Sequence, residues 1–122
     1  MDNNKLIELS VIIPTYNRRT ALNDCILSLV IQDYPQERYE IIVVDDGSSD
    51  GTAEMMAILT QKYPNIQYIL RSHHGPAAAR NAGIQKAAGA IIALTDNDCL
   101  PASDWVSNIL EGHNLHKDAL VI

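Results

Sequence analysis

The chain has 122 residues, of which 47% are hydrophobic, and a formal net charge of −6. A chain of this length can bury a real core, so residues 1–122 are interpreted as a single domain. The acidic charge argues against nonspecific nucleic-acid binding, which needs a basic surface.

Apolar residues recur in turn at strand spacing and at helix spacing. In chain order the pattern predicts a strand over 6–13, a helix over 20–32, a strand over 39–44, a helix over 52–62, a strand over 66–70, a helix over 77–88, a strand over 90–95, a helix from Ser103 or Asp104 to about Gly112, and the start of a fifth strand over 119–122. Thr20 is the expected N-cap of the first helix. Pro76 suits the first position of the third helix, and Gly89 is expected to end it.

Strands that alternate with helices form a parallel sheet with helices on both faces. The expected fold is therefore a three-layer, Rossmann-like α/β/α domain with a mainly parallel sheet. Right-handed crossovers make 3-2-1-4 the expected strand order. In this order the winding reverses between the first and fourth strands, and ligands bind beside such a reversal, at the carboxyl ends of the strands. The final apolar run has no closing turn, which favours a truncated domain.

Asp96 and Asp98 follow the fourth predicted strand and flank a single polar residue. Two such carboxylates can hold a hard divalent cation, Mn²⁺ or Mg²⁺, which is often shared with a substrate diphosphate. A cation would also offset the negative charge of the chain next to an anionic substrate. The alternative is a solvated turn, because Asp and Asn are common turn formers. After a buried strand at the winding reversal, we favour the metal site.

The loops after the first two strands carry further candidate ligand contacts. Tyr16 can stack on a base, and Arg18 can hold a phosphate. Asp45 and Asp46 point to opposite faces of an extended chain, so at most one of them reaches the ligand directly. Asp45 is expected to accept a hydrogen bond from a base N–H such as that of uracil, and the other acid to brace the following turn.

The third helix and the loop before it carry weaker signals. Arg80 can reach the acidic cluster or a phosphate, or it can form a structural ion pair, and the sequence does not separate the two. His73 and His74 are interpreted as solvated loop residues. The glycine fingerprint of dinucleotide-binding folds and the Walker loop are both absent after the first strand.

Cys25 and Cys99 are far apart in the sequence and have no metal-like spacing. We expect two reduced thiols in a cytoplasmic protein. No signal peptide is recognised, and no apolar run approaches the roughly 18 residues that a membrane span needs. A peripheral membrane association of a longer parent protein stays open.

Four segments together resemble the nucleotide-binding half of inverting glycosyltransferases of the family-two type, which have the GT-A fold. They are VIIPTYNR at 11–18, IVVDDGSSDGT at 42–52, GPAAARNAG at 75–83 and LTDND at 94–98. Any one of them alone is a weak signal. All four occur in the order and spacing of the family, and the resemblance covers about residues 9–106.

The resemblance implies a nucleotide-diphospho-sugar donor, most often a UDP-sugar, bound with Mn²⁺ or Mg²⁺ as a Lewis acid. The nucleotide-binding residues that it implies are Pro14, Thr15, Tyr16, Arg18, Asp45, Asp46, Gly75, Arg80 and Asp96, and the metal ligands are Asp98 and Asp96. The family places its catalytic base well beyond the Asp-x-Asp motif, and nothing up to Ile122 matches it. The chain is therefore expected to carry the donor and metal site without the base.

Two other functions fit parts of the pattern. A non-catalytic nucleotide-sugar-binding module needs the same donor site and no base. A metal-dependent phosphatase would use Asp96 as nucleophile and Asp98 as acid, but that class places its motif after the first strand. The donor sugar, the acceptor (a glycan, lipid or protein) and the oligomeric state stay open. An exposed sheet edge makes a homo-oligomer one outcome.

Overall fold

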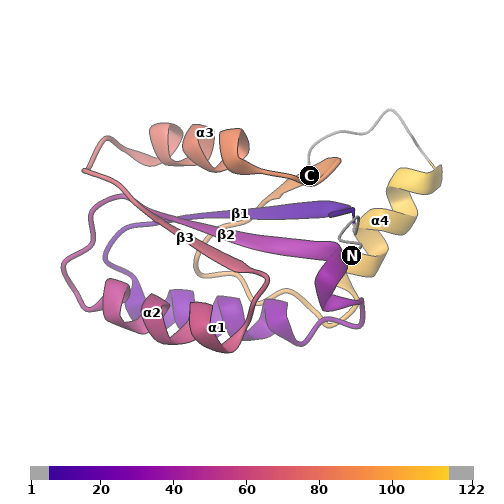
Figure 1. Cartoon of the computed structure of the whole chain (residues 1–122), viewed down its shortest axis with the longest axis horizontal. Helices are drawn as coiled ribbons and strands as arrows, with labels where there is room; N and C mark the ends of the chain where they lie inside the picture. Colours follow the sequence, from indigo (N-terminus) through magenta and orange to yellow (C-terminus); the bar gives the residue numbers. More distant parts are fainter. Residues whose placement is uncertain (1–5, 116–122) are drawn as a thin grey trace, which may run out of the picture.

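Helices cover both faces of a four-stranded parallel sheet in the computed structural model, which describes residues 6–115 (Figure 1). In chain order the elements are β1 (Leu9–Thr15), α1 (Arg19–Val30), a short 3-10 helix η1 (Gln36–Arg38), β2 (Tyr39–Asp45), α2 (Thr52–Lys62), β3 (Ile66–Leu70), α3 (Pro76–Lys86), β4 (Ile91–Leu94) and α4 (Trp105–Leu115). The strand order is β3-β2-β1-β4, as predicted.

The side chains of the two central strands, β1 and β2, pack into two separate apolar layers. On one face, Val11, Val43 and their neighbours pack against α1 and α2. On the other face, Ile12, Ile42 and Val44 pack against α3. Every residue of β2 is buried, as expected for a continuous β-branched strand that is covered on both faces. The sheet therefore has three-layer packing, with β1 and β2 at its centre.

Small residues let α3 lie close to the sheet. Ala79 is buried against β1 and β2. A Cβ added at Gly83 would lie 2.5 Å from Ile12 Cγ2, so a larger residue there would push the helix away. This close packing fixes where Arg80, the next residue after Ala79, stands relative to the ends of the strands.

Strand β1 extends through Pro14 to Thr15, beyond the predicted end. The carbonyl of Ile12 accepts a hydrogen bond from Thr95 N on the β4 side of β1. Pro14, two residues on, faces the same side, but the pairing with β4 stops at Ile12. Because no partner strand lies beside Pro14 there, its missing N–H costs the sheet no hydrogen bond.

The expected caps of two helices are wrong. Helix α1 begins at Arg19, so Thr20 lies inside it, and the carboxylate of Asp50 in another loop accepts a hydrogen bond from Arg19 N at 3.0 Å. Helix α3 starts at Pro76 as predicted but ends at Lys86, before Gly89. Gly89 instead packs on β1, where its N–H donates to Ser10 Oγ at 2.8 Å and a Cβ would clash with the backbone.

Helix α4 begins at Trp105, directly after Asp104, and continues past Gly112 to Leu115. The predicted fifth strand, 119–122, lies outside the described residues. No helix of the described part combines the length and apolar character that crossing a membrane would require.

Candidate functional site

A cavity of about 360 Å³ opens at the carboxyl ends of β1 and β4, beside the reversal of the sheet winding. Its lining residues are Pro14, Thr15, Tyr16, Arg18, Asp46, His73, Pro76, Ala79, Arg80, Asp96, Asn97 and Asp98. Most of the predicted site residues therefore meet around one space. Asp45 and Gly75 are not among the lining residues.

Asp45 is fully buried behind the cavity wall. Its Oδ2 accepts a hydrogen bond from the Tyr68 hydroxyl at 2.5 Å, and its Oδ1 accepts one from Ser48 N at 2.9 Å. Burial and the neighbouring Asp45 carboxylate raise the pKa of Tyr68 above its ordinary value. In this geometry Asp45 braces the turn after β2, and Asp46 faces the cavity.

Asp46 accepts hydrogen bonds from the loop that enters α3. Its Oδ1 accepts from His74 N at 2.8 Å, and its Oδ2 accepts from Gly75 N at 2.9 Å. The His73 ring lies 2.8 Å from Oδ2 through Nδ1. Burial raises the pKa of Asp46, but these N–H donors and the His73 ring outweigh it, so the pKa lies below its ordinary value. The carboxylate is therefore held ionised at one side of the cavity.

His73 is a cavity residue that the sequence interpretation missed. Its ring lies against that of Tyr16, with centroids 4.4 Å apart and planes tilted by 32°. The side chain is still 60% exposed, so a ligand can reach it. Both contacts of the His73 ring are with distant parts of the chain, so local sequence patterns do not reveal them. The sequence signal that could have indicated His73 is its position just after β3, whose carboxyl end lies at the same edge of the sheet.

The loop after β1 is tied to the loop after β2. Asn17 N donates to Ser48 Oγ at 2.7 Å, and Ser49 N donates back to Asn17 Oδ1 at 2.8 Å. Asn17 adopts a positive φ of 51°, which Asn tolerates better than most residues. Together with the cap that Asp50 provides to α1, these bonds join the loop that holds Tyr16 to the loop that follows Asp46.

The Asp-x-Asp turn after β4 is anchored on both sides. Asn97 Nδ2 donates to Thr15 Oγ1 at 3.2 Å, and the thiol of Cys25 donates to Asp96 O at 3.6 Å. Burial, followed by the charges of Cys99 and Asp98, raises the pKa of Cys25 to about 12. The side chains of Asp96 and Asp98 are exposed. Two exposed carboxylates on an anchored turn fit a hard divalent cation such as Mn²⁺ or Mg²⁺.

Arg80 lines the cavity from helix α3. It also lines a neighbouring hollow of about 320 Å³ with Asp96 and Cys99. Among the described residues no ion pair involves Arg80, so the structure gives no support to the structural ion pair considered from the sequence. Its guanidinium is thus available to an anionic group beside the Asp-x-Asp turn.

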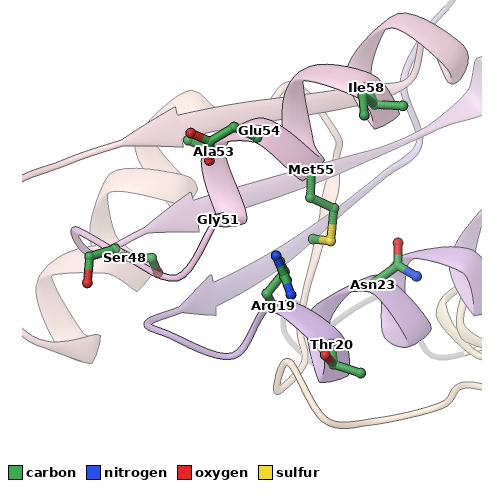
Figure 2. Close-up of a pocket in the computed structure, with 10 residues that line it drawn as sticks. Arg19, Thr20, Asn23, Ser48, Gly51, Ala53, Glu54, Met55 and Ile58 are labelled. Atoms are coloured by element: carbon green, nitrogen blue, oxygen red, sulfur yellow. The ribbon is translucent and has the colours of Figure 1, made fainter.

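A larger hollow of about 820 Å³ lies between the first turns of α1 and α2, where Arg19 and Met55 face each other (Figure 2). It shares no residue with the cavity beside the Asp-x-Asp turn, and Ile58 on its rim is 67% exposed. We place the functional site in the smaller cavity because the acids, Arg80 and the aromatic pair converge there.

The family model described as Glycosyl transferase family 2 matches residues 10–122. The glycosyltransferase AglE of Haloferax volcanii is 40% identical over 99 residues, which make up 80% of this chain and 33% of AglE. The poly(ribitol-phosphate) beta-glucosyltransferase of Bacillus spizizenii is 35% identical over 116 residues, which make up 92% of this chain and 18% of that protein. The chain thus spans a third or less of these relatives.

Two solved structures share the fold. S. aureus TarS 1-349, in complex with UDP-GlcNAc, superposes with a TM-score of 0.83 at 27% identity and covers 90% of this chain and 32% of that chain. The mannosyltransferase PcManGT from Pyrobaculum calidifontis, in complex with GDP-Man and Mn²⁺, gives a TM-score of 0.81 at 30% identity and covers 92% of this chain and 34% of that chain. The resemblance inferred from four motifs is confirmed, and the chain belongs to glycosyltransferase family 2.

Proposed function

We propose that the protein transfers a sugar from a nucleotide-diphospho-sugar, most simply a UDP-sugar, to an acceptor hydroxyl by a metal-assisted inverting displacement. The observation that carries the proposal is the single cavity in which an aromatic pair, an ionised buried acid, an arginine and the Asp-x-Asp turn meet. Solved relatives with bound UDP-GlcNAc, or with GDP-Man and Mn²⁺, add support.

The base of the donor fits the half of the cavity near β2. Tyr16 and His73 offer ring faces there, although their 4.4 Å separation leaves no space for a base between them. The base therefore stacks on an outer face of the pair. We assign the acceptor for the base N–H to Asp46, which lines the cavity, rather than to Asp45, which is buried behind it.

The diphosphate fits the half near β4. Arg80 is placed to donate hydrogen bonds to it, and Asp96 and Asp98 would hold Mn²⁺ or Mg²⁺. A cation bound there supplies Lewis-acid chemistry that offsets the negative charge on the departing diphosphate. The role of Thr15 is to position the turn, because its hydroxyl accepts the hydrogen bond from Asn97.

An inverting displacement also needs a base that takes the proton of the acceptor hydroxyl. Among the described residues that follow the Asp-x-Asp turn, neither Asp104 nor Glu111 lines the donor cavity, so we assign this role to neither of them. The chain alone is therefore expected to bind the donor and to transfer little or no sugar. Membership of family 2 argues against the phosphatase alternative, and a non-catalytic nucleotide-sugar-binding module is the second candidate function.

The test is thermal unfolding of the chain with UDP and Mn²⁺ together and with each alone. A ligand that binds only the native state at 100 times its Kd raises the free energy of unfolding by about 2.7 kcal/mol. We expect a rise in Tm with the pair of ligands that is lost in Asp98→Asn. No rise with any nucleoside diphosphate and cation would contradict the proposal.

A further inference from the structure

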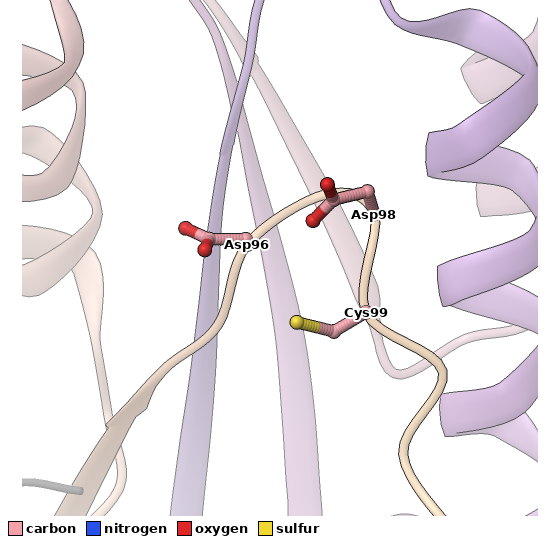
Figure 3. A group of neighbouring side chains, drawn as sticks. All are labelled: Asp96, Asp98 and Cys99. Atoms are coloured by element: carbon pink, nitrogen blue, oxygen red, sulfur yellow. The ribbon is translucent and has the colours of Figure 1, made fainter.

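Cys99 belongs to the same turn as the two carboxylates. One oxygen of Asp96, one oxygen of Asp98 and the Cys99 Sγ all lie within 4.8 Å of one another. Figure 3 shows the Asp98 carboxylate and the Cys99 thiol both directed toward the Asp96 side of the turn, whereas the Asp96 carboxylate points away from them and must turn to share a cation. A soft sulfur donor thus accompanies two hard oxygen donors in a group that the sequence, with its two widely spaced cysteines, did not indicate.

The backbone holds this group together. Cys99 N donates to Asp96 O at 3.3 Å, so Asp96 and Cys99 are the first and last residues of a hydrogen-bonded turn. The Asn97 side chain, which points away to Pro14 O and Thr15 Oγ1, and the buried Cys25 thiol, which reaches Asp96 O, fix the turn from outside. None of these contacts uses the three donor atoms, which stay available to a cation.

The spacing suits a small cation. In a tetrahedral site with metal–oxygen distances of about 2.1 Å and metal–sulfur distances of about 2.3 Å, neighbouring ligand atoms lie roughly 3.5 Å apart. The group must therefore contract by about an ångström, which exposed side chains can achieve by rotation. Three protein ligands would leave a fourth position for a diphosphate oxygen.

We propose that Cys99 is a third ligand of the cation held by Asp96 and Asp98, and that its sulfur shifts the preference of the site from Mg²⁺ toward Zn²⁺ and Co²⁺. This inference rests on the proposed function for the existence of the cation site. Thiolates select softer metals, whereas carboxylates alone suit Mg²⁺ and Mn²⁺. As the metal–sulfur bond forms, the proton of the thiol passes to the solvent.

The experiment is a titration of the full chain with Co²⁺ in the presence of UDP, followed by absorption. A cobalt–thiolate bond gives a sulfur-to-metal charge-transfer band in the near ultraviolet that oxygen ligands do not give. We expect this band in the unmodified chain and in Cys25→Ser, and its loss in Cys99→Ser. Cys25→Ser is the matched control because it removes the second nearby thiol but keeps a hydroxyl that can donate to Asp96 O.

Competition with Mg²⁺ and Zn²⁺ measures the preference. We expect the ratio of Zn²⁺ affinity to Mg²⁺ affinity to fall at least tenfold in Cys99→Ser. One outcome is that Co²⁺ binds and that Asp98→Asn abolishes its binding. If the charge-transfer band is then absent from the unmodified chain, or survives in Cys99→Ser, Cys99 is not a ligand of the cation. The proposed donor site is unaffected by that result. If neither Co²⁺ nor Mn²⁺ binds with UDP, both the inference and the proposed function fail.

Discussion

Two pairs of acids at the same edge of the sheet are held in opposite ways. After β2, Asp45 and Asp46 are 0% and 4% exposed, and each carboxylate accepts at least two hydrogen bonds from the protein. After β4, Asp96 and Asp98 are exposed, and one oxygen of each lies within 4.8 Å of the other and of the Cys99 Sγ. The first pair has its charge stabilised by the fold, whereas the second leaves its charge to be neutralised by a ligand.

The contrast separates acids that the folded chain itself hydrogen-bonds from acids that are left exposed to a ligand. Removing an acid of the first pair leaves part-buried N–H or O–H groups without their acceptor, which costs stability. Removing an acid of the second pair relieves repulsion between exposed carboxylates and costs binding. The following experiments test whether the two pairs separate in this way.

The largest effect is expected for Asp45→Ala. It leaves Ser48 N and the Tyr68 hydroxyl without their acceptor, and we expect a loss of about 3 kcal/mol in the free energy of unfolding, measured with urea. The matched change Asp98→Ala on the exposed turn should alter stability by less than about 0.5 kcal/mol. Equal losses of unfolding free energy in Asp45→Ala and Asp98→Ala would show that the two pairs of acids do not differ in their contribution to stability.

The next effect is on binding. We expect Asp98→Asn to weaken Mn²⁺-dependent UDP binding about 100-fold, which is about 2.7 kcal/mol, because an amide is a poor substitute for a carboxylate ligand. Isothermal titration calorimetry with UDP and Mn²⁺ measures the change. Asp104→Asn, which is exposed and outside the cavity, is the control and should bind like the unmodified chain.

A smaller effect depends on pH. The pKa of Asp46 is lower in the folded state than in the unfolded chain, so its contribution to stability is present above the ordinary Asp pKa and is lost as the pH falls through the folded value. Asp46→Asn should cost about 1.5 kcal/mol at pH 7, and the difference should shrink as the pH falls below about 3.9. A difference that stays constant from pH 7 to pH 3 would show that the charge of Asp46 is not involved.

The smallest effect is expected for His73→Ala. Loss of the ring that packs on Tyr16 should weaken UDP binding about threefold to fivefold, because aromatic pairs contribute about 0.5–1.5 kcal/mol. The neighbouring His74→Ala removes a side chain that bonds only within its own loop and should leave the affinity unchanged. Fluorescence competition with a labelled uridine diphosphate can resolve a change of this size.

The layers and the strand order were predictable because they depend on local patterns. The β-branched run of β2 and the alanines of α3 indicate, respectively, a strand covered on both faces and a helix that packs closely. The convergence on one edge followed from the topology alone. The Asp-x-Asp turn was located correctly because it directly follows a strand.

What could not be predicted depends on contacts between distant parts of the chain. The cap on α1 comes from Asp50, a residue 31 positions from Arg19. The burial of Asp45 follows from β2 continuing one residue further than predicted, which places its side chain on the same face as Ile41 and Val43. Cys25 and Cys99, 74 residues apart in sequence, meet at one turn only because α1 packs beneath the end of β4.

The paired hydrogen bonds between Asn17 and the Ser48-Ser49 segment have a consequence for engineering this scaffold. A loop transplanted after β1 from another family 2 member would lack its partner loop and would lose both bonds at once. A graft should therefore keep the fold of the site when the segments 16–19 and 47–50 are exchanged together, as one cassette, and disrupt it when either is exchanged singly.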